Sequence, residues 1–444
     1  MANINNRRSL LQRHRWKLLI SLFSVTALCA TGSIVMFLVK RWLYRQQLRI
    51  SEDHFIREQM RRRFIQTQED SLRTLCQLIP VFAIVLNKDE LNIDELFNEL
   101  KNKKRVTEES TNEENIEKSK AELWNELKSN SIVKIITITY TVSTFFLLTR
   151  LQLNMLARRE YLESAVNMNV EKKKNDSKGQ YSIMVLISRF WNNSNNQDNI
   201  INSTNENTIT SSTGYSMESN NNSNKIAYIN EQGYLSLSWW LLNNGYKTFK
   251  RLAHKYVAKE FETINPRDQL TLEEFSNHLS NVFQAINKDI LISKEDSINI
   301  RDVILPSDND LFTVLQQTLD QNELELLQED DTVLRRLMHE LTQCVQSSAS
   351  NIVLENLVNE SYQYIMNHIE EKVIAKNQKT SNVSAESSFQ MALFAIVSKD
   401  TCRDMLADNT SNNSSDASNE YLQCLDRLEA LDDLSSSVYS NFNV

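Results

Sequence analysis

The pattern of apolar and polar positions predicts a chain built from long helices. Its first strong feature is a run of 22 uncharged, mostly apolar residues from Leu18 to Val39. As a helix this run would be roughly 33 Å long, enough to cross a hydrocarbon core of about 30 Å. Trp16 and Trp42 flank it, where the two membrane interfaces would lie. We therefore expect a transmembrane anchor at 18–39.

Two other interpretations of this run are a cleaved signal peptide and a buried globular helix. The apolar region of a signal peptide is shorter, about 7–15 residues, and ends in small residues. This run ends in VKRWLYR instead. A globular helix is rarely apolar over such a length. The orientation of the anchor stays open, because five basic residues stand within about 20 residues on each side.

Beyond the anchor, apolar residues recur at helical spacing. We expect a helix over 51–86, which Pro80 should end or kink. A short amphipathic helix follows near 94–103, with an apolar side around Phe97. Residues 104–117 hold almost no apolar side chains, so they are predicted to be a mobile loop.

A new helix is expected to begin in the stretch KSKAELWNELKS. Ser119 and Glu122 form an S-x-x-E capping box, in which each residue satisfies a backbone donor of the other. Leu123, Trp124 and Leu127 then form a narrow apolar arc. Trp124 either packs into the core or is left for a partner. The residues alone favour the core, because buried tryptophan is common and a long apolar run begins eight residues later.

That run, 132–153, is either a second membrane span or a core helix. Lys134 and Arg150 leave only fifteen uncharged residues between them, a length that favours a core helix. Residues 171–224 then become rich in Asn, Ser and Thr. Such a tract has too few apolar side chains to form a core, so we predict a disordered insertion.

Helical patterns continue to the C-terminus. Thr271 and Glu274 form a second capping box, shortly after Pro266. Further helices are expected at 311–327, 334–366, 389–406 and 421–438, with polar tracts near 377–386 and 407–418. No internal repeat and no convincing strand pairing is found. The predicted fold class is all-α: a basic segment 1–17, the anchor 18–39, and one large helical bundle with long helices over 40–444.

Composition and charge support this architecture. The chain has only 5 Gly and 3 Pro in 444 residues, far below the usual 7% and 5% or so, which argues against tight hairpins and phosphate-binding loops. The net charge of −8 divides into +10 for residues 1–63 and −18 for the remainder. A basic N-terminal part indicates contact with a membrane surface rather than nucleic acid. Arg41, Arg45 and Arg49 form either a stripe against anionic headgroups or an ordinary solvated face.

The sequence contains no recognisable catalytic or metal-binding motif. The 5 cysteines are widely spaced and lack a CxxC pair, so neither a disulfide framework nor a zinc site is indicated, and reduced thiols weakly favour a cytosolic bundle. There is no GxGxxG, P-loop, GxSxG or HExxH, and the 6 histidines are scattered. We therefore expect no catalytic residue, metal or cofactor. The rival classes are a membrane-anchored enzyme of unknown chemistry and a tether that scaffolds two membranes.

Several stretches resemble one known family. They are SLLQRHRWKLLIS, VKRWLYRQQLRI, QTQEDSLRTLCQLIPV, KAELWNELK, LLTRLQLNMLARREYL, INPRDQLTLEEFS, ELTQCVQSSASNIVLE and LDDLSSSVYSNF. In this order they are similar to the peroxin three family of peroxisomal membrane biogenesis factors, budding-yeast type. They extend over nearly the whole chain, with the Asn-rich insertion outside the likeness.

The resemblance implies a non-catalytic protein that crosses the peroxisomal membrane once, with its N-terminus in the lumen and its helical domain in the cytosol. Segment 1–17, with Arg13, Arg15 and Lys17 before the anchor, would act in targeting together with the anchor. The domain would dock peroxin nineteen, a farnesylated chaperone of newly made membrane proteins, whose amphipathic N-terminal helix lies in an apolar groove. Recruitment of an inheritance factor and a pexophagy receptor is also implied. A scaffold or tether of another organelle, without a chaperone partner, is the alternative.

The resemblance also implies which residues form the groove. Its Lys-x-Glu-aliphatic-Trp pattern, followed by an acid and Leu-Lys, falls on Lys120, Glu122, Leu123, Trp124, Glu126, Leu127 and Lys128. The preceding Leu-Lys-Asn falls on Leu100, Lys101 and Asn102, across a longer loop than the family has. The resemblance thus favours a groove position for Trp124 and an inward one for Leu123. Lys120 and Lys128 are expected to flank the groove and to steer an acidic partner helix.

Overall fold

The computed structural model describes residues 7–88, 91–106, 119–175, 217–292, 298–377, 387–407 and 419–441. Within these ranges, the side chains of 7–35, 48–53, 103–106, 164–175, 217–224, 292 and 377 lie outside the description. Contacts divide the chain into two units, Met1–Ile65 and Gln66–Val444. Helix α1 (Arg7–Lys88) passes from the first unit into the second.

In the first unit, α1 carries exposed apolar side chains at the C-terminal end of the predicted anchor and just beyond it. Those described are Met36, Phe37, Leu38, Val39, Trp42, Leu43 and Tyr44, between 49% and 64% exposed. In water such exposure is unfavourable, and a bilayer would remove it. The side chains of most of the predicted anchor, and of the targeting residues Arg13, Arg15 and Lys17, lie outside the described residues.

The expectation that Pro80 ends or kinks its helix is corrected in one respect. Helix α1 continues past Pro80 to Lys88. Proline inside a helix costs about 3 kcal/mol. Phe82 and Leu86 follow it and are almost fully buried, and burial of two such side chains contributes about 3–6 kcal/mol. Packing therefore outweighs the local penalty.

The second unit is almost entirely helical, which confirms the all-α fold class. Its longer helices are α2 (Ile93–Val106), α3 (Lys120–Asn175), α5 (Met217–Leu235), α7 (Tyr246–Phe261), α8 (Leu272–Asn287), α12 (Thr332–Val345), α13 (Ser348–Asn377) and α14 (Met391–Met405). The shorter ones are α6 (Ser238–Trp240), α9 (Ile300–Ile304), α10 (Asp308–Thr318), α11 (Gln321–Glu329), α15 (Glu420–Asp426) and α16 (Glu429–Ser440), with π-helical turns η1 (Leu241–Gly245) and η2 (Lys288–Ile292). Two short strands, β1 (Gln269–Leu270) and β2 (Phe389–Gln390), pair antiparallel, a contact that sequence analysis had missed.

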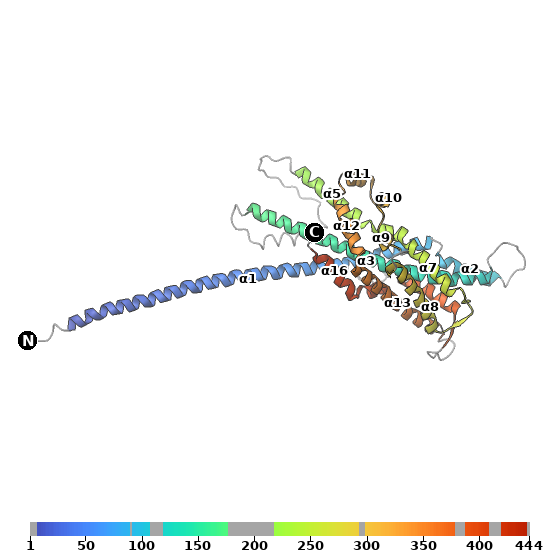
Figure 1. Ribbon diagram of the computed structural model, residues 1–444, viewed down its shortest axis with the longest axis horizontal. Helices are drawn as coiled ribbons and strands as arrows, with labels where there is room; N and C mark the ends of the chain where they lie inside the picture. The colour runs from blue at the N-terminus through green and yellow to red at the C-terminus, as the bar shows by residue number, and fades with distance from the viewer. Residues whose placement is uncertain are drawn as a thin grey trace, which may run out of the picture. The chain divides into compact units, whose positions relative to one another are not determined.

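Helix α3 is the central element of this unit (Figure 1). It packs against α2, α7, α13, α14 and α16, and every residue from Ser131 to Gln152 is buried. Among the described residues, one stretch, Lys120–Glu163, is long and apolar enough to cross a membrane, and its most apolar window is completely buried within the protein. The preference for a core helix over a second span at 132–153 is thereby confirmed.

Four buried cations on α3 bind the ends of other helices. Lys128 donates to the carbonyl oxygens of Phe261 and Ile264, at the end of α7. The other three act on α1, α15 and α16: Lys134 donates to Asn87 Oδ1 and the Leu91 carbonyl, Arg150 pairs with Asp426, and Arg158 donates to the Val438 and Asn441 carbonyls and pairs with Glu340. A cation at a helix C-terminus is favourable, because it satisfies free carbonyls and opposes the helix dipole.

Several helix boundaries differ from expectation. The regions 311–327, 334–366 and 421–438 are each divided into two helices, at Leu319–Asp320, Gln346–Ser347 and Arg427–Leu428. Helices also extend into both ends of the predicted disordered insertion 171–224: α3 reaches Asn175, and α5 begins at Met217. The remainder of that insertion and most of the predicted loop 104–117 lie outside the described residues.

Candidate docking site

The first turns of α3 and one side of α2 form a small apolar cluster that is separate from the main core. Ile93, Leu100, Leu123 and Leu127 are buried in it, and Leu96, Phe97 and Trp124 pack against it with partial exposure. We call these seven residues the α2–α3 cluster. Its four buried members form a small core of their own. Its three partly exposed members, two of them aromatic, form an apolar surface on that core.

The capping box predicted at the start of α3 positions these side chains. The Ser119 amide donates to Glu122 Oε2 at 2.9 Å, and the Glu122 amide donates to Ser119 Oγ at 3.2 Å. The helix therefore begins one residue after Ser119. This start points Leu123 inward with no exposed surface and leaves Trp124 partly exposed. The expectation that Leu123 is the inward packer of the two is confirmed.

The eight predicted partner-binding residues divide into two groups. Leu100, Leu123, Leu127 and Lys128 are at most 5% exposed. The other four are Lys120, Lys101 and Asn102, which are exposed, and Trp124, which is partly exposed. The three buried leucines thus support the surface from beneath. Of these eight residues, only those of the second group are accessible at the surface in this conformation.

The expectation that Lys128 flanks the groove is wrong. Its side chain turns away from the α2–α3 cluster, toward the end of α7, where its ammonium group donates to two carbonyls at 2.9 and 2.6 Å. Burial lowers the pKa of Lys128, and Asp268 opposes that shift. A desolvated ammonium that is held by two carbonyls stabilises the fold and cannot steer a partner.

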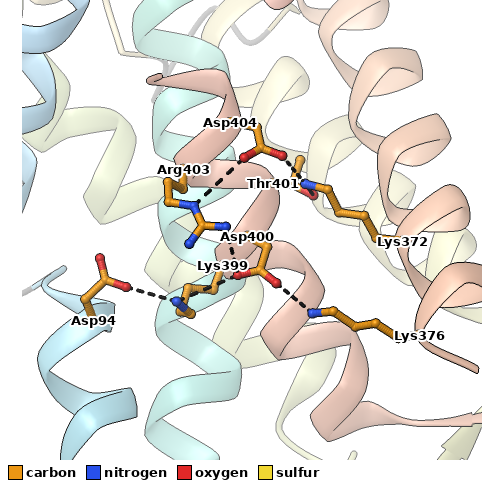
Figure 2. A network of polar contacts seen from close by, with 8 residues as sticks. All are labelled: Asp94, Lys372, Lys376, Lys399, Asp400, Thr401, Arg403 and Asp404. Carbon is orange, nitrogen blue, oxygen red and sulfur yellow. Dashed lines mark hydrogen bonds and ion pairs between the residues drawn. The ribbon is translucent and has the colours of Figure 1, made fainter. Parts of the chain in front are cut away.

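A polar contact from α14 reaches the same site. The Lys399 ammonium lies 3.0 Å from Asp94 Oδ1 and 4.9 Å from the centre of the Phe97 ring, and both partners belong to α2. Figure 2 shows that Lys399 belongs to a network in which Asp400, Arg403 and Asp404 of α14 meet Lys372 and Lys376 of α13. The site is therefore connected to the main bundle through charged side chains as well as through α3.

Sequence analysis missed two kinds of residue here. It placed Leu96 and Phe97 on the apolar side of a short helix, but it had no signal that this side meets Trp124. It missed Lys399 entirely, because Lys399 and Asp94 are 305 positions apart in the chain. Only folding brings them together.

Metal-binding groups and cysteine reactivity can be checked for the described residues. No group of three or more His, Cys, Asp or Glu among them is placed to hold a metal. The four described cysteines are free. Burial raises the pKa of Cys402 to about 12 and that of Cys424 to about 11. Such thiols stay protonated at neutral pH and are poor nucleophiles.

Comparison with known proteins identifies the family. The Peroxin-3 family model matches residues 9–117 and 107–441. The chain is 44% identical to Peroxisomal biogenesis factor 3 of Saccharomyces cerevisiae, over 100% of this chain and 98% of that protein. It is 41% identical to the protein of the same name from Eremothecium gossypii and 39% identical to that from Kluyveromyces lactis, in each case over 98% of this chain and at least 99% of the relative. The chain therefore belongs to the Peroxin-3 family, a family of peroxisome biogenesis factors.

Proposed function

We propose that this chain is a non-catalytic docking receptor in the peroxisomal membrane, and that the α2–α3 cluster binds the amphipathic N-terminal helix of the chaperone peroxin nineteen. Docking delivers newly made membrane proteins to the peroxisome. By family resemblance, the same receptor serves an inheritance factor and a pexophagy receptor. A tether of another organelle, without a chaperone partner, remains the alternative function.

The observation that carries this proposal is the partial exposure of Trp124 on a cluster separate from the main core. Tryptophan and phenylalanine at the centre of an apolar patch are frequent interface hot spots. Lys120, Lys101 and Asn102 are exposed near them in sequence and supply a polar rim. This arrangement suits a helix with an apolar face and acidic flanks.

The exposed apolar side chains at 36–44 support an anchor at 18–39. In this proposal α1 crosses the bilayer once, the basic segment with Arg13, Arg15 and Lys17 lies in the lumen and acts in targeting, and the helical domain lies in the cytosol. The burial of α3 supports a single crossing, since α3 is the described stretch that could otherwise span.

Trp124→Ala tests the docking role. We expect this change to weaken binding of full-length peroxin nineteen by about 2–4 kcal/mol, the range of interface hot spots, because the apolar contact with the partner helix is lost. The melting temperature should change little, since Trp124 is only partly buried. Titration calorimetry gives the affinity, and a thermal melt on the same sample gives the stability.

Trp239→Ala is the matched control. Trp239 is also partly exposed but lies in α6, outside the α2–α3 cluster, so its loss should leave the affinity unchanged. A core tryptophan replaced by alanine would instead cost about 3–5 kcal/mol of stability. A sharp fall in the melting temperature of Trp124→Ala, with the affinity per folded molecule preserved, would make Trp124 an ordinary core residue.

A further inference from the structure

We propose that Lys399 is a positioning residue for the docking site, which holds α2 in place so that Phe97 and Trp124 form one continuous surface. This inference rests on the proposed function. Lys399 does not belong to the α2–α3 cluster. It acts on that surface from α14, a helix that packs along α3 in the main core.

Two independent contacts join Lys399 to α2. Its ammonium is 3.0 Å from Asp94 Oδ1, in the first turn of α2, and 4.9 Å from the centre of the Phe97 ring, almost one turn later. The Lys399 side chain is only 11% exposed, whereas that of Asp94 is 61% exposed. An exposed ion pair is weak by itself. A cation that is largely removed from water and lies over an aromatic ring is held more firmly.

The position of α2 depends on the contacts of Lys399 because few apolar side chains of α2 are buried. Its buried side chains, Ile93 and Leu100, belong to the separate cluster with Leu123 and Leu127 rather than to the main core. An element with few buried apolar contacts opens at a low free-energy cost. Loss of one polar tether should therefore loosen α2 before it affects the rest of the bundle.

Charged neighbours on α13 and α14 surround Lys399. Asp400 lies 3.8 Å from Lys399, and it also pairs with Lys376 of α13 at 2.6 Å. Asp404 pairs with Lys372 at 2.5 Å (Figure 2). Lys134 binds Asn87 and the Leu91 carbonyl, just before α2 begins. Lys134 and Lys399 thus hold the start of α2 from α3 and from α14.

Lys399→Met tests the inference, because methionine keeps an unbranched apolar stem and removes the charge. We expect the backbone amides of α2 to exchange hydrogen about five- to ten-fold faster, while the amides of α14 and the melting temperature stay unchanged. Binding of full-length peroxin nineteen should weaken about three- to ten-fold, the scale of one lost cation–π contact with its ion pair.

Two variants separate positioning from general damage. Lys399→Arg keeps the charge and stacks well on aromatic rings, so it should retain both the slow exchange of α2 and the affinity. Lys376→Met is the matched control. Lys376 lies in the same network and pairs with Asp400, on the side away from α2 (Figure 2), so α2 should exchange as in the unmodified chain.

The outcomes are distinct. If Lys399→Met leaves the exchange of α2 or the affinity as in the unmodified chain, the inference is overturned and the proposed function stands. If Lys399→Arg is as damaged as Lys399→Met, the effect comes from packing, and the positioning role of the charge is overturned. If the unmodified chain itself fails to bind peroxin nineteen, the proposed function falls and takes the docking role of Lys399 with it.

Discussion

Trp124 and Lys128 lie one turn apart on α3, and the surroundings of each side chain decide which of them stays accessible at the surface. Lys128 donates to the carbonyls of Phe261 and Ile264 at the end of α7 and is buried there. Trp124 has no comparable place in the main core and stays at the edge of the α2–α3 cluster. The sequence pattern contains both residues but does not distinguish these two environments, because the partners of Lys128 are more than 130 positions away.

Lys128→Met should lower the free energy of unfolding by about 1–3 kcal/mol, because the Ile264 carbonyl loses its ammonium donor and the Phe261 carbonyl keeps only the Ile264 amide. Urea denaturation measures this change. Lys120→Met is the control: Lys120 is exposed at the start of the same helix, so its replacement should stay within about 0.5 kcal/mol. Equal effects of the two changes would contradict the capping role of Lys128.

The same variant has a defined pH dependence. Burial lowers the pKa of Lys128 in the folded chain below its ordinary value of 10.5. Between the folded-state pKa and pH 10.5 the unfolded chain therefore binds more protons, and the stability due to Lys128 increases as the pH rises through that window. The gap in stability between the unmodified chain and Lys128→Met should widen there. A gap that narrows would show that the folded-state pKa is raised instead.

At the scale of elements, helices could be predicted wherever a local signal exists. The Ser119 and Thr271 capping boxes were found from sequence and are both formed. The break at Asp320 was missed, although Asp320 and Glu323 also form a capping box, because apolar periodicity continues across it. At Pro80 the sequence predicted a helix end or kink, but the helix continues to Lys88. The cause is tertiary: the turn that follows Pro80 is buried, and local sequence does not show this. In the proposed docking site, the partly exposed position of Trp124 could be predicted from a motif, whereas the contact of Lys399 with α2 could not.

One element depends on a glycine for a close approach. Gly245 ends the π-helical turn η1, and a Cβ atom there would lie 2.2 Å from the carbonyl oxygen of Val303 in α9. Backbone cannot move aside cheaply, so Gly245→Ala should destabilise the protein by about 1–3 kcal/mol, the usual cost of overpacking. Thermal or urea unfolding measures it.

Gly233→Ala is the control for that change. Its Cβ would lie 3.2 Å from Cδ2 of Leu315, a flexible side chain that can shift, and alanine favours helix by about 1 kcal/mol over glycine. The effect at Gly233 should therefore be small. A larger loss at Gly233 than at Gly245 would contradict the close approach of η1 to α9.

At the scale of the whole molecule, contacts divide the chain into two parts. Residues 66–444 hold the main core and the proposed docking site, and residues 1–65 hold the predicted anchor and targeting segment. The sequence predicts a division at residue 40, where the anchor at 18–39 ends and the helical bundle begins. The contacts place it after Ile65, so that the first part of α1 beyond the anchor belongs with the anchor.

Division of the chain between Ile65 and Gln66 tests this organisation. Residues 66–444 should be helical by circular dichroism and monodisperse in sedimentation without detergent, because α3 is buried within this part. Residues 1–65 fused to a fluorescent protein should label peroxisomes. Detergent dependence of 66–444 would mean that α3 enters the membrane, and diffuse or secretory labelling by 1–65 would contradict the targeting role.

The buried cations of α3 also matter before the protein has folded. A newly made α3 is long and apolar enough to be drawn into a bilayer. Lys134 and Arg150 leave only fifteen uncharged residues between them, fewer than the roughly 20 that a membrane span needs, so an inserted α3 would have to take a charge toward the hydrocarbon region, which is unfavourable. In the nascent chain these residues discourage insertion, and in the finished protein they bind the ends of other helices. One pair of charges thus protects the chain from a wrong topology during synthesis and then stabilises the correct fold.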